Sequence, residues 1–347
     1  MCGMRDSTDF SDELERLSTS AWAYAALAAA LETGLLERLR APTDPRLAAA
    51  ELGIDSELAD DLIEALLALG VVSGDADHVA PTPAFETLSG PSVSRVVQAE
   101  IRGDHLQIQN MLARLREGDD VVGWDIEDPV ALTAQGETGS LIALLVEALL
   151  PRLEGLEQRM ARPGARLLDV GAGVGVVATE LCRLWPEAEA VGLEPHRTAR
   201  ELGRSRIAAD GLSDRIALRD ERVEMLGETD AYDLAFVPQP FLDRASLEAA
   251  LPRILRALRP GGWLIALTHE IPVGDRRSAA ARTFRARIWG GGVIGGDEIA
   301  AMLAGSGFGS IRGDYPVGSF RATCARCPLP QSAEPAPIER HWDTAAP

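Results

Sequence analysis

The stretch Leu167-Leu168-Asp169-Val170-Gly171-Ala172-Gly173-Val174-Gly175 decides the fold of this chain. Its first four residues predict a buried strand, and residues 176–185 after the glycines predict a helix. Glycine has no Cβ, so the backbone of such a turn can approach a ligand closely. The amides at the start of the helix then face that ligand. The stretch therefore predicts a nucleotide-like cofactor site at a strand–turn–helix junction.

Predicted strands and helices alternate from Arg166 onward, which is typical of a parallel, doubly wound α/β sheet. Two late strands, 310–315 and 319–325, are joined by only Pro316-Val317-Gly318. This connection is too short for a parallel crossover, so these two strands must pair antiparallel. The other strands are expected at 167–170, 190–193, 215–218, 234–237 and 263–267, and further helices at 198–209, 245–258 and 297–304.

The front of the chain is predicted to be helical. After a helix at 18–39, the pattern predicts two short helices, 45–52 and 55–69, and a two-stranded wing that ends near Pro81. We therefore expect three parts: an all-α, winged-helix-like domain at 1–160, a cofactor-binding domain at 161–327, and a disordered tail at 328–347 that is rich in Pro and Ala.

The composition excludes several classes of protein. The net charge is −19, and the second helix of the winged-helix-like part carries five acidic residues and no basic one, so we expect no nucleic-acid partner. The chain has neither an apolar run near 18 residues nor a signal-like apolar start, which predicts a cytoplasmic protein without a membrane span. Cys324 and Cys327 lack a second ligand pair, so we expect reduced thiols and no metal.

The glycine spacing bears on which cofactor binds. A dinucleotide site has Gly-x-Gly-x-x-Gly followed by an acid about twenty residues later. Here Gly171, Gly173 and Gly175 alternate, and Val176 stands where the third glycine would be. Glu194 ends the second strand, but a carboxylate there accepts from the hydroxyls of any ribose. The turn alone therefore leaves the cofactor open.

Three further features favour one family. Asp169 precedes the first glycine by two residues, Arg259-Pro260-Gly261-Gly262-Trp263 forms a predicted turn before the fifth strand, and the sheet closes with an antiparallel hairpin. Residues 161–325 thus resemble the class I S-adenosylmethionine-dependent methyltransferases. With the helical front domain, the chain is similar to the small-molecule O-methyltransferases that have an N-terminal winged-helix dimerisation domain; Glu194-Pro195-His196 also matches that family.

This resemblance implies a cofactor, S-adenosyl-L-methionine, and a homodimer formed through the front domain. The turn from Gly171 to Gly175, with Asp169 before it, would hold the methionine portion, and Glu194 would bind the ribose. Asp220 or Glu221 would face the adenine amine, and the local sequence leaves the choice between them open.

The catalytic base of the family is missing. Many members carry a His after the fourth strand, followed by Asp-Trp, whereas residues 237–243 read VPQPFLD. His105, in the helical region, and His269, at the end of the fifth strand, are the candidates to replace it. An amine, a carbon or an already ionised phenol would need little help from a base, because methyl transfer can be accelerated by positioning alone.

Arg285 and Trp289 are candidates for the substrate wall, together with Trp124. Arg285 belongs to a group of arginines at 276–287, just before Trp289, and these arginines either clamp an acidic acceptor or form a solvated helix face. Glycines at 290–292 and 295–296 indicate a mobile lid or a tight turn.

The sequence thus predicts S-adenosylmethionine-dependent methyl transfer to a small molecule, such as an aromatic or polyketide-like natural product, with oxygen favoured as the acceptor atom. N- or C-methylation without a His base, or a rearrangement or decarboxylation that uses the cofactor without methyl transfer, are the alternatives. A transcriptional regulator that uses the winged helix is disfavoured by its acidic helix.

Overall fold

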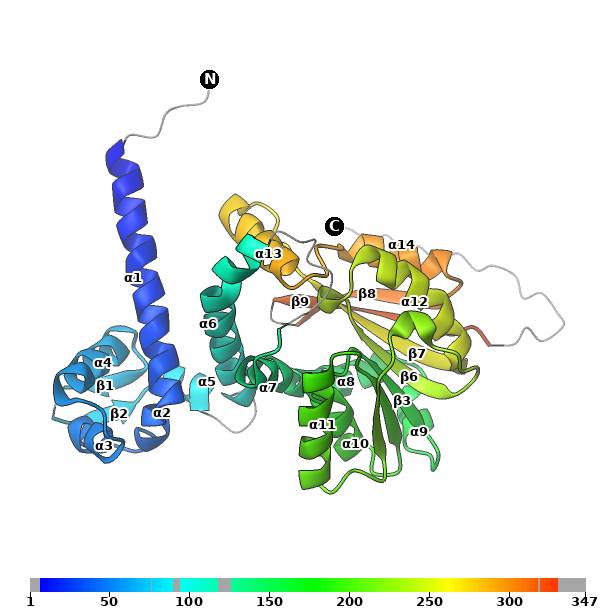
Figure 1. The fold of residues 1–347 in the computed structure, drawn as a ribbon, viewed down its shortest axis with the longest axis horizontal. Coiled ribbons are helices and arrows are strands. Elements are labelled where there is room, and N and C mark those ends of the chain that lie inside the picture. Colours follow the sequence, from blue (N-terminus) through cyan, green and yellow to red (C-terminus); the bar gives the residue numbers. More distant parts are fainter. Residues whose placement is uncertain (1–6, 76, 90–93, 118–125, 318, 330–347) are drawn as a thin grey trace, which may run out of the picture.

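The computed structural model describes residues 7–75, 77–89, 94–117, 126–317 and 319–329 (Figure 1). A helical front part lies beside an α/β part, and helices that line the cavity described below join the two. Trp124 and the tail beyond residue 329 lie outside the described residues.

The front part contains the predicted pair of short helices and the hairpin. Asp55 caps the second of these helices by accepting from the amides of Glu57 and Leu58 at 3.0 and 3.2 Å, a strong helix-start signal. The helix expected at 18–39 is instead two helices, because Gly34 adopts a φ of 80° that interrupts it. The elements are α1 (Ser7–Glu32), α2 (Leu35–Arg38), α3 (Pro45–Glu51), α4 (Ser56–Ala68), the antiparallel strands β1 (Val72–Gly74) and β2 (Val79–Pro81), and α5 (Pro83–Ser89).

The helices between Ser94 and Met160 connect the front part to the sheet, and some of them share the core of the sheet. Ile142, Leu149 and Met160 belong to the same buried core as the sheet residues, so the domain division expected at residue 160 stays a prediction. Pro129–Arg152 is the segment of the described residues that is long and apolar enough to cross a membrane, but here it is broken into shorter helices, and the buried apolar side chains between Ile142 and Leu149 join that core. The elements are α6 (Ser94–Glu117), α7 (Pro129–Glu137), α8 (Ser140–Leu149), η1 (Leu150–Arg152) and α9 (Leu156–Met160).

The sheet has seven strands in the order β5-β4-β3-β6-β7-β9-β8. The first five are parallel, and β9 pairs antiparallel with both β7 and β8, which confirms the predicted closing hairpin. The strands are β3 (Arg166–Val170), β4 (Glu189–Leu193), β5 (Ile216–Arg219), β6 (Tyr232–Pro238), β7 (Leu258–His269), β8 (Gly309–Val317) and β9 (Phe320–Arg326).

The prediction that Arg259–Trp263 forms a separate turn before the fifth strand was wrong. These residues lie inside β7, which starts at Leu258 and pairs with Tyr232 of β6 before the register shifts. Gly261, with a φ of 78°, absorbs the irregularity.

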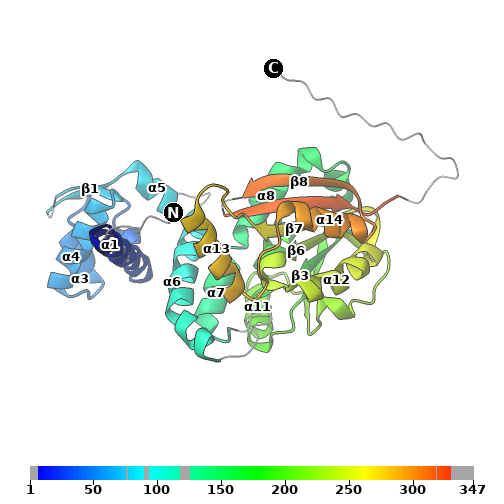
Figure 2. The ribbon, with the colours of Figure 1, turned by 90° about the horizontal axis from the view of Figure 1, so that it is seen from above.

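Helices cover both faces of the sheet (Figures 1 and 2). Buried residues of α8, α9 and α10 form the core on one face, and those of α12 and α14 form the core on the other. Such burial on both faces is typical of parallel sheets. The remaining elements are α10 (Val176–Leu184), α11 (Arg197–Ala209), η2 (Val223–Met225), η3 (Gln239–Phe241), α12 (Arg244–Ala257), α13 (Arg276–Ile288) and α14 (Gly296–Gly305).

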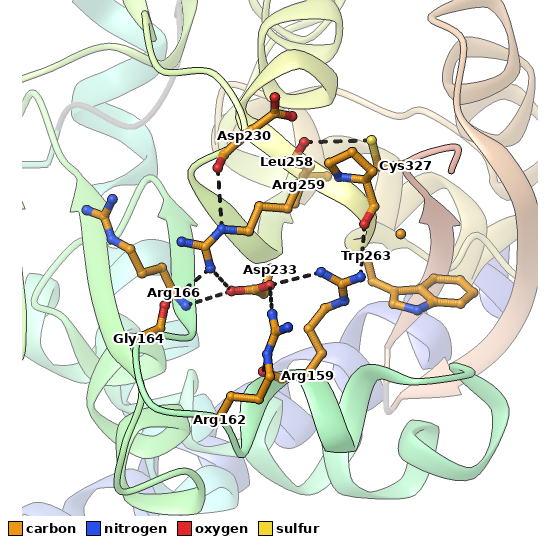
Figure 3. Close-up of polar contacts among 12 residues, drawn as sticks. Arg159, Arg162, Gly164, Arg166, Asp230, Asp233, Leu258, Arg259, Trp263 and Cys327 are labelled. Carbon is orange, nitrogen blue, oxygen red and sulfur yellow. Dashed lines mark hydrogen bonds and ion pairs between the residues drawn. The ribbon is translucent and has the colours of Figure 1, made fainter. Parts of the chain in front are cut away.

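A buried carboxylate connects neighbouring strands at the amino ends of the parallel strands, which is the end of the sheet opposite the cavity. Asp233 of β6 is fully buried and lies among three arginines (Figure 3). Arg159 and Arg162 donate to its Oδ1 at 3.1 and 2.9 Å, Arg259 donates to Oδ2, and the amide of Arg166 donates to Oδ2 at 3.1 Å. This network joins α9, β3, β6 and β7, so each Asp233 oxygen has more than one donor and no buried lone charge remains.

Asp233→Asn is expected to lower the free energy of unfolding by about 3 kcal/mol, because it removes one partner of a buried ion-pair network. Denaturant titration followed by far-UV circular dichroism measures this loss. Glu201→Gln is the matched control, since Glu201 pairs with Arg197 on an exposed helix face. A loss for Asp233→Asn no larger than that of the control would contradict this account of the network.

Candidate active site

A cavity of about 300 Å³ lies at the carboxyl ends of the parallel strands, where α/β sheets of this topology bind ligands. The ends of β3, β4, β6 and β7 form its floor, and α6, the α7–α8 junction and α13 form its walls. The lining groups used below are Glu100, Asp104, Asp169, Gly171, Gly173, Glu194, His196, Glu221, Glu224, Phe241, Asp243, Ser246, Arg285, Trp289 and Phe320.

The glycine turn is held by one carboxylate. Gly171, Gly173 and Gly175 all have positive φ, at 64, 55 and 76°, which non-glycine residues rarely adopt. The amide of Gly173 donates to Glu194 Oε2 at 2.7 Å, and the amide of His196 donates to Oε1 at 2.7 Å. Each carboxylate oxygen keeps a further lone pair for a donor in the cavity, as expected of a group that binds ribose hydroxyls.

Two further glycines support the turn and were missed by the sequence analysis. A Cβ at Gly203 of α11 would lie 3.2 Å from the carbonyl oxygen of Gly173, and one at Gly192 of β4 would lie 2.6 Å from the Cβ of Ala172. Both positions therefore allow neighbouring elements to approach the turn. Their isolated glycines in a helix and a strand were the available signal.

Asp169 is a buried carboxylate at the end of β3. It accepts from the backbone amide of Ala178, while its Oδ2 has no hydrogen-bond partner among the described residues. Burial raises its pKa to about 7, and the charge of Glu194 adds to this effect. A buried acceptor without a partner is costly, so this atom fits a ligand that brings a donor or a positive charge.

The structure separates the two candidates for adenine recognition. Glu221 lines the cavity, whereas the side chain of Asp220 is 70% exposed and accepts from Arg200 at 2.8 Å. Asp220 therefore stabilises α11 against the end of β5, and Glu221 is left as the carboxylate that faces the cavity.

Aromatic side chains from three elements form the wall opposite the glycine turn. Trp289 stacks on Phe241 with ring centroids 5.2 Å apart and an interplanar angle of 10°, and Phe320 lies 6.2 Å from Trp289. The indole Nε1 of Trp289 donates to Gln107 of α6. This wall suits a flat, apolar ligand. Phe241 and Phe320 were not singled out in the sequence.

Arg285 lies on this wall, with its charge already partnered. It packs over the Trp289 ring at 4.8 Å and donates to both oxygens of Asp104 at 3.1 and 3.2 Å. The other arginines of 276–287 do not line the cavity. The glycine run forms the tight turn rather than a lid: the amide of Gly291 donates to the carbonyl of Pro240 at 3.0 Å, and a Cβ at Gly291 would lie 2.4 Å from that carbonyl.

Neither candidate histidine is among the residues that line the cavity. His269 is buried behind the aromatic wall, 5.0 Å from Phe320 between ring centroids. Burial lowers its pKa to about 3, and the charges of Arg285 and Arg282 add to this effect. His105 lies on α6 beside Asp104. A catalytic role for either stays a prediction, and the geometry gives it no support.

The cysteines of 324–327 are buried free thiols, and burial raises the pKa of Cys324 to about 12. Among the described residues, no group of three or more His, Cys, Asp or Glu side chains could hold a metal ion.

Comparisons with known proteins agree with this geometry. Residues 167–262 match the model of a methyltransferase domain. The methyltransferase GfsG of Streptomyces halstedii is 28% identical over 163 residues, which cover 47% of this chain and 55% of that protein. The match thus spans about half the length of that relative.

Solved structures share the whole fold. An O-methyltransferase family protein from Burkholderia thailandensis superposes with a TM-score of 0.65 at 19% identity and covers 95% of this chain and 100% of that one. Human N-acetylserotonin methyltransferase, in complex with S-adenosylmethionine, gives a TM-score of 0.66 at 13% identity, with 95% and 100% covered.

The sheet order, the glycine turn and the matched segment identify a methyltransferase domain, and the human neighbour of the same fold was solved in complex with S-adenosylmethionine. This domain stands behind helices in the fold of the O-methyltransferases. The cavity fits that cofactor: Gly173 has open space where a Cβ would be, Asp169 Oδ2 lacks a partner, and Glu194 has acceptor capacity for ribose hydroxyls.

Gly173→Leu is expected to abolish binding of S-adenosylmethionine, because its side chain would enter the open space at the turn. Isothermal titration calorimetry measures this loss. Gly211→Leu is the matched control, since Gly211 has a φ of 69° and equally open surroundings but lies outside the cavity lining. Wild-type affinity in Gly173→Leu would contradict the placement of the cofactor.

Proposed function

We propose that this protein transfers the methyl group of S-adenosylmethionine to the hydroxyl of a small aromatic acceptor, such as an aromatic or polyketide-like natural product. One observation carries the proposal: a single cavity joins the turn held by Glu194 to an aromatic wall made by Phe241, Trp289 and Phe320. The structural neighbours include a mitomycin 7-O-methyltransferase, which supports oxygen as the acceptor atom.

The residues divide into two groups by place. Asp169, Glu194 and the turn would hold the cofactor, with Glu221 near its adenine, and the cofactor would supply an electrophilic methyl group on a sulfonium. The aromatic wall would stack the acceptor and exclude water, so that the acceptor oxygen is held in an attacking position.

When the purified protein is incubated with methyl-labelled S-adenosylmethionine and a panel of aromatic hydroxyl compounds, the label is expected in the methylated product.

Glu194→Gln should weaken cofactor binding by roughly tenfold or more, since it removes a charge-assisted hydrogen bond. Glu201→Gln, an exposed carboxylate on α11, should leave binding unchanged. Cofactor binding without transfer to any hydroxyl, amine or carbon acceptor would contradict the proposed activity.

We also propose that the protein is a homodimer formed through α1. Phe10, Leu14 and Leu17 lie on one face of this helix and are 66, 56 and 43% exposed. The first half of α1 projects beyond the other helices of the front part (Figure 1), and Glu13 on it pairs with Arg277 of α13. Exposed apolar residues at helical spacing are typical of an association surface.

Sedimentation velocity is expected to give a dimer for the wild type and a monomer for Leu14→Glu combined with Leu17→Glu. Leu47→Glu, which changes an equally exposed leucine on α3, should leave the dimer intact. A monomeric wild type would overturn the proposal.

A further inference from the structure

The proposed methyl transfer leaves one question about the cavity: which group takes the proton of the acceptor. Several carboxylates at the strand ends have other assignments: Asp169, Glu194 and Glu221 belong to the proposed cofactor site. Asp243 caps α12 and accepts from the amide and hydroxyl of Ser246 at 2.7 and 3.2 Å. Glu224 accepts from Arg222 at 3.3 Å, and Glu194 holds the glycine turn.

Two other carboxylates enter the cavity from the opposite side, on α6. Glu100, Gly103, Asp104 and Gln107 follow one another at positions i, i+3, i+4 and i+7, so they share one face of the helix. Glu100, Gly103 and Asp104 line the cavity, and Gln107 accepts from Trp289. The helix therefore presents a polar face to the cavity, and Gly103 leaves space beside Asp104, since a Cβ there would meet only the Gln135 side chain, at 3.8 Å.

Asp104 is fixed in place from two other elements. Arg285 of α13 donates to both of its oxygens, at 3.1 and 3.2 Å, and the hydroxyl of Tyr24 on α1 is hydrogen-bonded to it. Its side chain is 25% exposed. Helices α6 and α13 lie side by side in both ribbon views.

The same contacts connect Asp104 to the loop where the expected base is absent. Arg285 packs over Trp289 at 4.8 Å, and Trp289 stacks on Phe241 of η3. This loop, which directly follows β6, has no titratable side chain before Asp243. Asp104 thus lines the same cavity as this loop and is joined to it through Arg285 and Trp289.

We propose that Asp104 is the general base that takes the hydroxyl proton of an aromatic acceptor, with Arg285 and Tyr24 as its positioning residues. The proposal rests on the proposed function. As the acceptor's oxygen–carbon bond forms, the sulfur–carbon bond to the methyl group breaks, and the hydroxyl proton passes to the carboxylate of Asp104. The sulfonium charge disappears while Asp104 becomes neutral, and the proton later leaves Asp104 for solvent, to which its side chain is 25% exposed.

The charges around Asp104 suit this role. Burial raises the pKa of its carboxyl group, against the opposite effects of Arg285 and the Tyr24 hydrogen bond. Glu100 lies on the same helix, and its own pKa is raised by burial and by the charge of Asp104. A carboxylate with a raised pKa is a stronger base at neutral pH.

The test uses phenols of increasing acidity: phenol, 4-nitrophenol and 2,4-dinitrophenol. Asp104→Asn is expected to lower kcat for phenol by roughly 10²- to 10⁴-fold, the usual contribution of a general base, with little change in KM. This loss should shrink along the series and vanish for 2,4-dinitrophenol, which is ionised without help. A loss that is equal for all three phenols would mean a structural role and would overturn the proposal.

A second measurement does not depend on turnover. Binding of 4-nitrophenol, followed by its absorbance in the presence of S-adenosylhomocysteine, should weaken as the pH rises and the phenol ionises, because the Asp104 carboxylate accepts from the neutral hydroxyl and repels the phenolate. Asp104→Asn should lose this dependence. The same pH dependence in both proteins would contradict the assignment.

Controls separate folding from chemistry. The affinity for S-adenosylmethionine should be unchanged in Asp104→Asn, whereas its melting temperature should fall because Arg285 loses its charged partner. Asp104→Asn with Arg285→Gln removes both charges of the pair and should regain stability while remaining slow with phenol. Transfer only to amine or carbon acceptors would sustain methyl transfer itself but overturn both the hydroxyl acceptor and the role of Asp104. Absence of transfer to every acceptor would overturn both.

Discussion

The site depends on the two backbone hydrogen bonds that the carboxylate of Glu194 accepts. This carboxylate accepts from the amides of Gly173 and His196 at 2.7 Å each, and so ties the turn after β3 to the end of β4. The turn has three residues with positive φ, so it needs both glycine and an external acceptor to keep its shape. With the turn held, its free side faces the cavity. Gly192 and Gly203 then let β4 and α11 pack against it.

Two buried carboxylates of the sheet differ in how fully they are paired. Asp233, at the amino ends of the strands, has several donors for each oxygen, whereas Asp169 keeps one oxygen without a partner and has a pKa of about 7 because of burial. The first carboxylate stabilises the sheet and the second costs stability. A destabilising group at the carboxyl ends of the strands, together with a stabilising network at their amino ends, is typical of a binding site built on a rigid scaffold.

The sequence predicted the sheet well because its signals are local. Alternating strands and helices, the glycine turn and the short connection at residues 316–318 are each visible within a few residues. The choice between Asp220 and Glu221 was not local, since it depends on Arg200 drawing Asp220 away from the cavity. The acceptor wall was harder still. Asp104, Phe241, Trp289 and Phe320 come from four separate elements, and periodicity does not show which faces of α6 and α13 meet.

The most direct measurement of the central claim is a crystal structure of the protein with S-adenosylhomocysteine. The account predicts the ribose hydroxyls within hydrogen-bond distance of Glu194, the adenine beside Glu221 and the amino-acid portion against the turn at Gly171–Gly175, with its sulfur facing the aromatic wall. A molecule bound elsewhere, or a ribose that makes no contact with Glu194, would contradict it.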